Sequence, residues 1–146
     1  MKLWHKDLIY YLPTNELIRL WHDCLSIARD ISLVGHTSDI FINKVMDYPI
    51  CHFYWYSNHV IDELHIRGYN IPQSSIASFN NYMVRIDNST NSDHTICICD
   101  EDIFYDWHND RYLMQCLSNL DEIYDCQGMT DEEYYNILDN FSHILY

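Results

Sequence analysis

The 146-residue sequence has little glycine, little proline and few basic residues. It contains three Gly and three Pro, and this scarcity excludes the collagen-like and low-complexity classes of protein. Eight residues are Lys or Arg against 22 Asp and Glu, which gives a formal net charge of −14. A protein that coats nucleic acid or an anionic membrane non-specifically needs a basic surface, so the charge argues against that class.

Long apolar runs are also missing from the sequence. No stretch reaches the roughly 18 apolar residues of a membrane span, and Met1–Lys6 does not lead into the apolar run of a secretion signal. We therefore expect a cytoplasmic protein without a membrane partner, in which the six cysteines are reduced thiols. A disulfide scaffold is the alternative. The length predicts one domain over residues 1–146 with one core.

The charge is distributed unevenly along the chain. Residues 1–75 hold six basic and eight acidic residues, whereas residues 76–146 hold two basic and 14 acidic residues. The first half can therefore present a locally neutral or basic face, and the second half is strongly acidic. The polar stretch Asp87–Asp93 has the composition of an exposed loop, which we expect at 87–93.

Apolar residues recur at intervals of three and four in several segments, a pattern typical of helices that face a core. The spacing predicts helices at about 14–30, at about 53–67 and at about 109–128. A further short helix is expected to begin at a cap at Thr37 or Ser38 and to end before Pro49. Thr130 and Glu133 have the spacing of a capping box and predict a fifth helix. The alternating segment 95–99 is too short for a sheet without a partner strand. The predicted fold class is therefore all-α, a compact fold of about five helices.

Three clusters of chemistry-bearing residues allow two interpretations each. Cys97-x-Cys99 with His94 is spaced more tightly than structural zinc sites, and the nine histidines show no metal-binding motif, so we expect free thiols and no metal ion or other cofactor. The run Phe53–Tyr56 offers stacking surfaces for a nucleobase or packs in the core. The carboxylates of Asp100–Asp102 bind a hard cation or form a solvated loop.

A series of short motifs occurs in a fixed order along the chain. The motifs are Met1-x-Leu3-Trp4-His5-x-Asp7-Leu8-Ile9, Leu12-Pro13, His22-Asp23-Cys24, His36-Thr37-Ser38, Tyr54-x-Tyr56, Glu63, Arg67-Gly68-Tyr69 and His108-Asn109-Asp110-x-Tyr112-Leu113. Together they resemble the pyrimidine-dimer DNA glycosylase family, particularly its small bacterial members that open with a Leu-Trp-His signature. The resemblance implies a compact helical domain that excises damaged pyrimidines and nicks the resulting site, with damaged DNA as its partner.

The resemblance also implies which residues carry the chemistry. The family uses its amino-terminal α-amine as the nucleophile and a carboxylate from the first long helix, and these positions fall on Met1 and Asp23. An α-amine has a pKa of about 7.7–8.0 against about 10.4 for lysine, so a useful fraction can attack the sugar C1′ at neutral pH. Bulky Lys2 should hinder removal of Met1. The substrate-binding residues implied by the resemblance are Trp4, His5, His22, His36, Tyr56 and Arg67.

The sequence departs from the family pattern in three respects. Asp23 stands where the family carries Glu, which withdraws the carboxylate by roughly 1.5 Å. His22 replaces an Arg, and the neutral segment Ser32–Gly35 replaces a Gly/Lys-rich loop, so these contacts to the DNA backbone are missing. The acidic second half would repel a duplex unless it points away.

These departures leave a second interpretation beside the enzyme. In it, the scaffold has no catalytic activity and the chain is an acidic interaction protein, such as a phage or mobile-element binding module or a nucleic-acid mimic. Its carboxylate-rich half would then engage a basic protein partner. The two interpretations differ in what surrounds Met1, because an enzyme needs an open pocket at the amino terminus with a carboxylate beside it.

Overall fold

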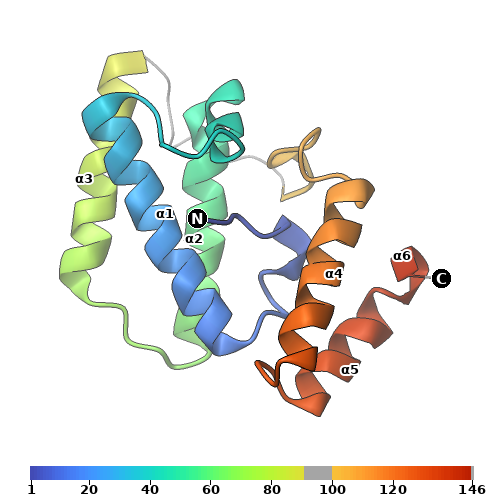
Figure 1. Ribbon diagram of the computed structural model, residues 1–146. Helices are drawn as coiled ribbons and strands as arrows, with labels where there is room; N and C mark the ends of the chain where they lie inside the picture. Colours follow the sequence, from blue (N-terminus) through green and yellow to red (C-terminus); the bar gives the residue numbers. More distant parts are fainter. Residues whose placement is uncertain (91–99, 146) are drawn as a thin grey trace.

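The computed structural model describes residues 1–90 and 100–145, and helices are the regular secondary structure that it shows there (Figure 1). The α-helices are α1 (Thr14–Val34), α2 (Ile50–Ile66), α3 (Gln73–Thr90), α4 (Asp110–Asp125), α5 (Asp131–Asn140) and α6 (Ser142–Leu145). Short 3₁₀ helices are η1 (Lys6–Leu8), η2 (Ile42–Asp47) and η3 (Asp100–Asp102). The predicted all-α fold class is confirmed.

Proline and glycine set the limits of the first two long helices. Pro13 and Pro49 occupy the N-cap positions of α1 and α2. Gly35 at φ +92° ends α1 and Gly68 at φ +82° ends the turn after α2, in a left-handed conformation that glycine adopts without steric cost. The predicted helix over 14–30 is thus confirmed and extends to Val34.

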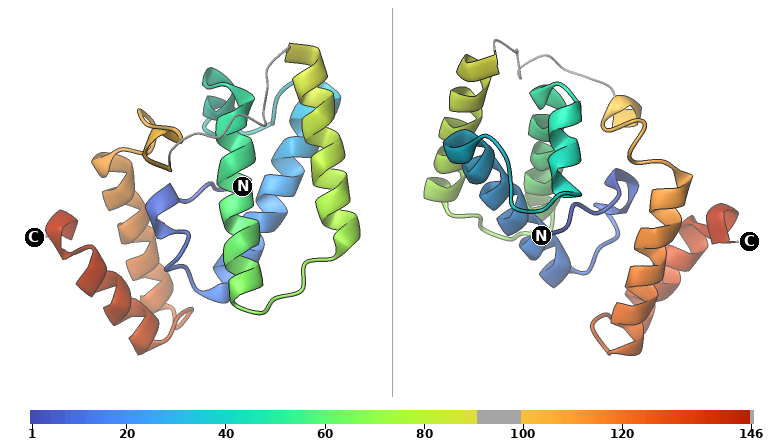
Figure 2. Two further views of the ribbon diagram at one scale, coloured as in Figure 1. Left: turned by 180° about the vertical axis from the view of Figure 1, so that it is seen from behind. Right: turned by 45° about the horizontal axis from the view of Figure 1, so that its top comes forward.

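The first three long helices pack on one another and enclose a common core (Figure 2). Trp21 of α1 and Phe53 of α2 are both in ring contact with Phe79 of α3, with centroids 5.5 and 6.1 Å apart. All three rings are buried. The buried stripe of α1 is the one that the sequence spacing predicts: Leu17, Leu20, Trp21, Cys24, Ile27, Ala28 and Ile31.

Helices α4, α5 and α6 form a second group, and the amino-terminal segment lies between α4 and the first group (Figures 1 and 2). Leu3, Leu8 and Leu12 of this segment are fully buried. The capping box that starts α5 is confirmed, because Thr130 Oγ1 accepts from the Glu133 nitrogen at 3.1 Å and Glu133 Oε1 accepts from the Thr130 nitrogen at 2.9 Å. The buried leucines make the amino-terminal segment part of the core between the two groups of helices.

Two segments differ from the sequence-based expectation. The helix expected before Pro49 is the 3₁₀ helix η2, which spans six residues. Helix α3 was not predicted, and it includes residues 87–90 at the start of the segment expected to form a loop. Residues 91–93, the segment 95–99 and the Cys97-x-Cys99 motif with His94 lie outside the described residues.

Two further expectations concern the thiols and the membrane. Cys24, Cys116 and Cys126 are free thiols, as predicted for a chain without a disulfide scaffold. Burial raises the pKa of the Cys24 thiol to about 12. Across residues 1–90 and 100–145, every helix is too short or too polar to cross a membrane.

Candidate active site

Asp23 lies beside the start of the chain. Its side-chain oxygen Oδ2 accepts a hydrogen bond from the backbone nitrogen of Lys2 at 3.1 Å. Asp23 is half-buried on α1, between the buried side chains of Trp21 and Cys24. Only the carbonyl and α carbon of Met1 separate the Lys2 nitrogen from the α-amine. The structure therefore brings the Asp23 carboxylate next to the amino terminus.

Two tyrosines hold the peptide groups that follow. Tyr112 of α4 donates a hydrogen bond to the carbonyl oxygen of Leu3. Tyr56 of α2 donates to the carbonyl oxygen of Trp4 at 2.5 Å. Burial raises the pKa of both phenols well above the usual value, which keeps them protonated as donors. The two bonds fix the direction in which the backbone leads to the amino terminus.

A pair of buried histidines ties the same segment to the loop before α4. His5 Nδ1 accepts from the Asp7 nitrogen at 3.1 Å, which leaves His5 Nε2 as the protonated nitrogen that donates to the His108 carbonyl at 3.0 Å. His108 Nδ1 accepts from the Lys6 nitrogen at 3.0 Å. Burial lowers the pKa of both rings, in agreement with neutral imidazoles that each accept one hydrogen bond.

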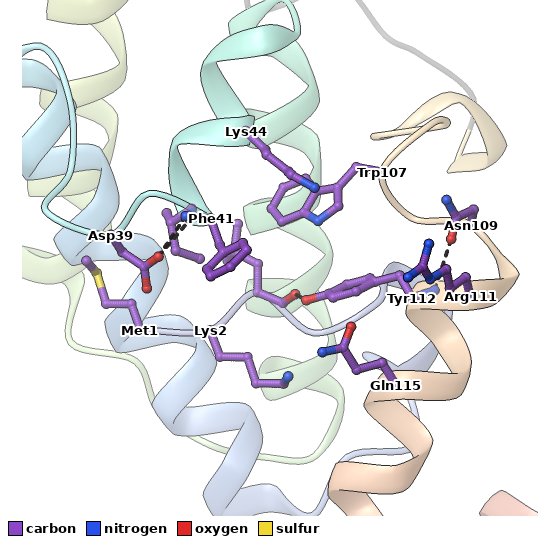
Figure 3. A pocket seen from close by; sticks show the side chains of 12 residues that line it. Met1, Lys2, Asp39, Phe41, Lys44, Trp107, Asn109, Arg111, Tyr112 and Gln115 are labelled. Atoms are coloured by element: carbon purple, nitrogen blue, oxygen red, sulfur yellow. Dashed lines mark hydrogen bonds between the residues drawn. The ribbon is translucent and has the colours of Figure 1, made fainter.

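A cavity of about 540 Å³ opens at the amino terminus (Figure 3). It is lined by Met1, Lys2, Leu3, Asp39, Phe41, Ile42, Lys44, Trp107, Asn109, Arg111, Tyr112 and Gln115. Met1 and the turn of Asp39 and Phe41 lie on one side in this view, and Arg111, Tyr112 and Gln115 of α4 lie on the other. Met1 is 45% exposed, so the amino terminus is accessible from solvent.

The cavity is cationic although the protein is strongly acidic. Lys2, Lys44 and Arg111 line it, against the single carboxylate of Asp39. The Lys2 ammonium lies 4.6 Å from the centroid of the Trp4 ring and 5.9 Å from that of Tyr112, within range of cation–π attraction. Three of the eight basic residues of the chain thus gather where the amino terminus emerges. This arrangement suits an anionic ligand.

The acidic segment of η3 lies apart from the cavity lining. The Lys6 ammonium donates to the carbonyl oxygens of Glu101 and Ile103, both at 2.7 Å. Asp100 Oδ1 is 2.9 Å from His59 Nε2, and the residues of η3 are exposed. Among the residues that the structure describes, no group of three or more His, Cys, Asp or Glu side chains could hold a metal ion.

The other residues that the resemblance implicates take different positions. Trp4 and His5 are buried within the amino-terminal segment, and buried Tyr56 donates a hydrogen bond to that segment at the Trp4 carbonyl oxygen. His22 and His36 are exposed and are not part of the cavity lining. The structure does not bring these two histidines together with Met1.

Arg67 also lies away from the cavity, where it fastens the far end of the amino-terminal segment. Its guanidinium donates to the carbonyl oxygens of Leu12 at 2.6 Å and Tyr10 at 3.1 Å. Arg67 Nε also donates to Glu63 Oε1 at 3.0 Å. The contacts of Arg67 are thus with its own chain.

Sequence reasoning missed Lys44, Trp107 and Arg111 as cavity residues. The small number of basic residues was an available signal, because each of them is a candidate contact for an anion. Three of the eight line this one cavity. Tyr112 belonged to the recognised motif around residues 108–113, but no role was assigned to it. Its hydrogen bond to Leu3, 109 positions earlier, has no signature in sequence spacing.

Comparison with known protein families gives one match. The family model for pyrimidine dimer DNA glycosylases matches residues 1–76, just over half of the chain. Comparisons with curated proteins and with solved structures give no match. The matched region includes Met1, Asp23 and η2, whereas the α4 wall of the cavity lies beyond it. With the open amino terminus and its neighbouring carboxylate, this match shows that the chain belongs to the pyrimidine dimer DNA glycosylase family.

Proposed function

We propose that the chain is a DNA glycosylase and abasic-site lyase that uses the α-amine of Met1 as its nucleophile and Asp23 as its catalytic carboxylate. The observation that carries the proposal is the 3.1 Å hydrogen bond from the Lys2 nitrogen to Asp23 Oδ2. This bond supports the proposal because it joins Asp23 to the first peptide group of the chain. Met1, which is 45% exposed, and Lys2 line the cationic cavity, whereas Asp23 lies behind this lining.

The reaction begins at the sugar carbon that carries the damaged pyrimidine. The amine nitrogen forms a bond to C1′ as the bond from C1′ to the base breaks, and the base leaves with the electron pair and takes up a proton. The sugar ring then opens, O4′ accepts a proton, and the bond from C1′ to nitrogen becomes a protonated imine. Loss of a proton from C2′ expels the 3′ phosphate and cleaves the strand.

Asp23 has two tasks in this sequence. Its negative charge stabilises the positive charge that develops on the sugar and on the imine. Its second oxygen can receive the proton that the amine loses and deliver it to O4′. The bond to the Lys2 backbone supports both tasks, because it fixes one carboxylate oxygen relative to the Met1–Lys2 peptide. A side chain shorter than the family's Glu is therefore held at the first peptide group of the chain.

The proposed partner is damaged duplex DNA. Phosphates on either side of the target nucleotide would meet Lys2, Lys44 and Arg111, which all line the cavity. These three cations take the place of the basic groups that are missing at His22 and Ser32–Gly35. The acidic groups of η3 do not line the cavity, so phosphates can approach Met1 without meeting them directly.

Borohydride trapping on DNA with one abasic site tests the proposal. We expect a covalent adduct whose mass and fragmentation place the DNA on the α-amine of Met1. Acetylation of the amino terminus should abolish it, and Asp23→Asn should slow its formation by roughly a hundredfold. Lys2→Gln is the matched control: it removes a competing lysine ε-amine that lines the cavity, and it should still form the adduct on Met1. An adduct on a lysine, or equal trapping by acetylated protein, would overturn the assignment of the nucleophile.

A further inference from the structure

Ile40 and Phe41 are two large apolar side chains that the fold leaves in solvent. Ile40 is 84% exposed and Phe41 is 74% exposed. They lie between the end of α1 and the start of η2. Two adjacent apolar side chains at such exposure contribute little to the core.

The turn that carries this pair is held in place by its own side chains. Thr37, which is buried, donates its backbone nitrogen to Asn43 Oδ1 at 2.9 Å, and Asn43 Nδ2 donates back to the Thr37 carbonyl at 3.2 Å. Asp39 Oδ1 accepts from the backbone nitrogens of Phe41 at 2.9 Å and Ile42 at 3.3 Å. The apolar pair is therefore projected by a fixed backbone, which lowers the entropy cost of inserting it into a partner.

One member of the pair, Phe41, also lines the cavity at the amino terminus, and Ile40 precedes it in the chain. Phe41 lines that cavity together with Met1, and Lys44 lines it three residues further on (Figure 3). Trp107 contributes a second aromatic ring to the lining. An exposed apolar projection thus adjoins cations and the amino terminus. This combination matches a duplex, which offers phosphates to the cations and the apolar faces of stacked bases to the projection.

We propose that Ile40 and Phe41 form a wedge that enters the base stack of duplex DNA next to the nucleotide presented to Met1. The inference rests on the proposed function for the choice of target nucleotide, and deepens it by naming how the duplex is opened. Apolar side chains inserted at a base step unstack it and bend the duplex. Phe41 would stack on the base that is left without a neighbour, while Lys44 would hold the adjacent phosphate.

The test uses a duplex in which a 2-aminopurine lies beside a tetrahydrofuran abasic analogue, because the analogue binds without forming an imine. Binding of the unaltered protein should raise the 2-aminopurine fluorescence as the base step opens. Phe41→Ala should remove most of that rise and weaken duplex affinity by roughly tenfold, the size of one base–aromatic contact. Phe41→Trp should restore both. Ile66→Ala is the matched control, because Ile66 is 77% exposed on α2 and outside the cavity lining.

Salt dependence separates a wedge from a phosphate contact. Apolar insertion releases no counterions, so Phe41→Ala should weaken binding equally at every salt concentration, whereas Lys44→Gln should reduce the slope of log affinity against log salt by about 0.9. A Phe41→Ala variant with unchanged fluorescence response, or no duplex binding even at low salt, overturns the wedge. The readout needs no covalent chemistry, so failure to trap abasic DNA would count against the proposed function alone.

Discussion

The backbone nitrogen of Lys2 and the carboxylate of Asp23 are joined across 21 residues by a hydrogen bond of 3.1 Å. The bond connects α1 to the first peptide group of the chain, and it uses a carboxylate that helix geometry alone would have left at the edge of the core. One Asp23 oxygen is committed to the backbone, and in the proposed mechanism the other transfers the proton. The length of the side chain at position 23 can therefore be tested by mutation.

Asp23→Glu should increase the rate of imine formation, because the added methylene carries the free oxygen further toward the amine while the backbone bond can still form. Single-turnover trapping on abasic DNA measures the rate, with Asp23→Asn as the variant that keeps the volume and loses the charge. Misplacement on the order of 1 Å can cost about a hundredfold in rate, so the change should be easily measured. An unchanged or lower rate for Asp23→Glu would mean that the shorter carboxylate is already in the productive position.

Tyr112→Phe should lower kcat by roughly tenfold and leave KM nearly unchanged, because the ring beside Lys2 remains while the hydrogen bond to the Leu3 carbonyl is lost. We regard Tyr112 as a positioning residue, which orients the segment that ends at the amine. Loss of one hydrogen bond should also reduce the free energy of unfolding by about 1 kcal/mol.

Tyr124→Phe is the control for this variant. The Tyr124 hydroxyl donates to Asp131 Oδ1 at 2.7 Å between α4 and α5, away from the cavity lining. The Tyr124→Phe variant therefore loses a tyrosine hydrogen bond, as Tyr112→Phe does, but leaves the amino-terminal segment unchanged. If both variants lower kcat to the same extent, the effect of Tyr112 is one of general stability and not of positioning.

Much of the fold could be predicted from the sequence, because its signals are local. Gly35 and Gly68 mark helix ends, and Thr130 with Glu133 marks a helix start. Helix α3 was missed although Ile76, Phe79, Met83 and Ile86 have helical spacing, since the Ser and Asn residues between them resemble a loop. Its place was decided by contact with Trp21 and Phe53, which is a tertiary effect.

The candidate site was predictable only where a family motif marked it. The motifs predict Met1 and Asp23 in this way, and their catalytic roles stay predictions. The cavity could not be found, because Lys44 and Arg111 come from segments 67 residues apart that only the packing of α4 brings to the same opening. Tyr56 and His5 were expected to meet substrate, but the structure buries both and bonds them to the chain itself.

The stability of the protein should fall as the pH falls below about 6.5, the ordinary pKa of histidine. Burial lowers the pKa of His108 in the folded state, so between that lowered value and 6.5 the unfolded chain binds a proton that the folded chain does not. The stabilisation that the neutral His108 ring gives to the folded state is fully present above the pKa of this ring in the unfolded chain. It is lost as the pH falls through the pKa of the ring in the folded protein. The slope from this ring is at most about 1.4 kcal/mol per pH unit.

His108→Asn tests this origin, because the amide oxygen can still accept from the Lys6 nitrogen but does not titrate. Chemical denaturation from pH 7.5 to pH 5 should give a shallower dependence for His108→Asn than for the unaltered protein. His65→Asn, at an exposed position on α2, controls for the loss of a histidine as such. Parallel curves for all three proteins would show that His108 does not set the pH dependence.

The carboxylates at 100–106 should weaken DNA binding through space and not by contact. Asp100, Glu101, Asp102 and Asp106 are exposed, none lines the cavity, and Asp106 precedes the cavity residue Trp107. Their replacement by Asn or Gln should strengthen binding to an abasic duplex at low salt. The gain should shrink near 0.15 M salt, where the Debye length is about 8 Å.

A control variant with the same net charge replaces Asp121, Asp125, Glu132 and Asp139, which lie on α4 and α5 outside the cavity lining. It should strengthen DNA binding less than the change at 100–106. Asp121 and Asp125 lie in the last turns of α4, whereas the cavity residues of this helix lie in its first turns. Equal gains from both variants would mean that net charge alone sets the affinity. A different outcome would be that neither variant binds DNA more tightly and that the change at 100–106 abolishes binding to a lysine-rich peptide. The acidic segment is then a contact surface for a basic protein partner. In that case the interaction-protein interpretation replaces the enzymatic one for this part of the chain.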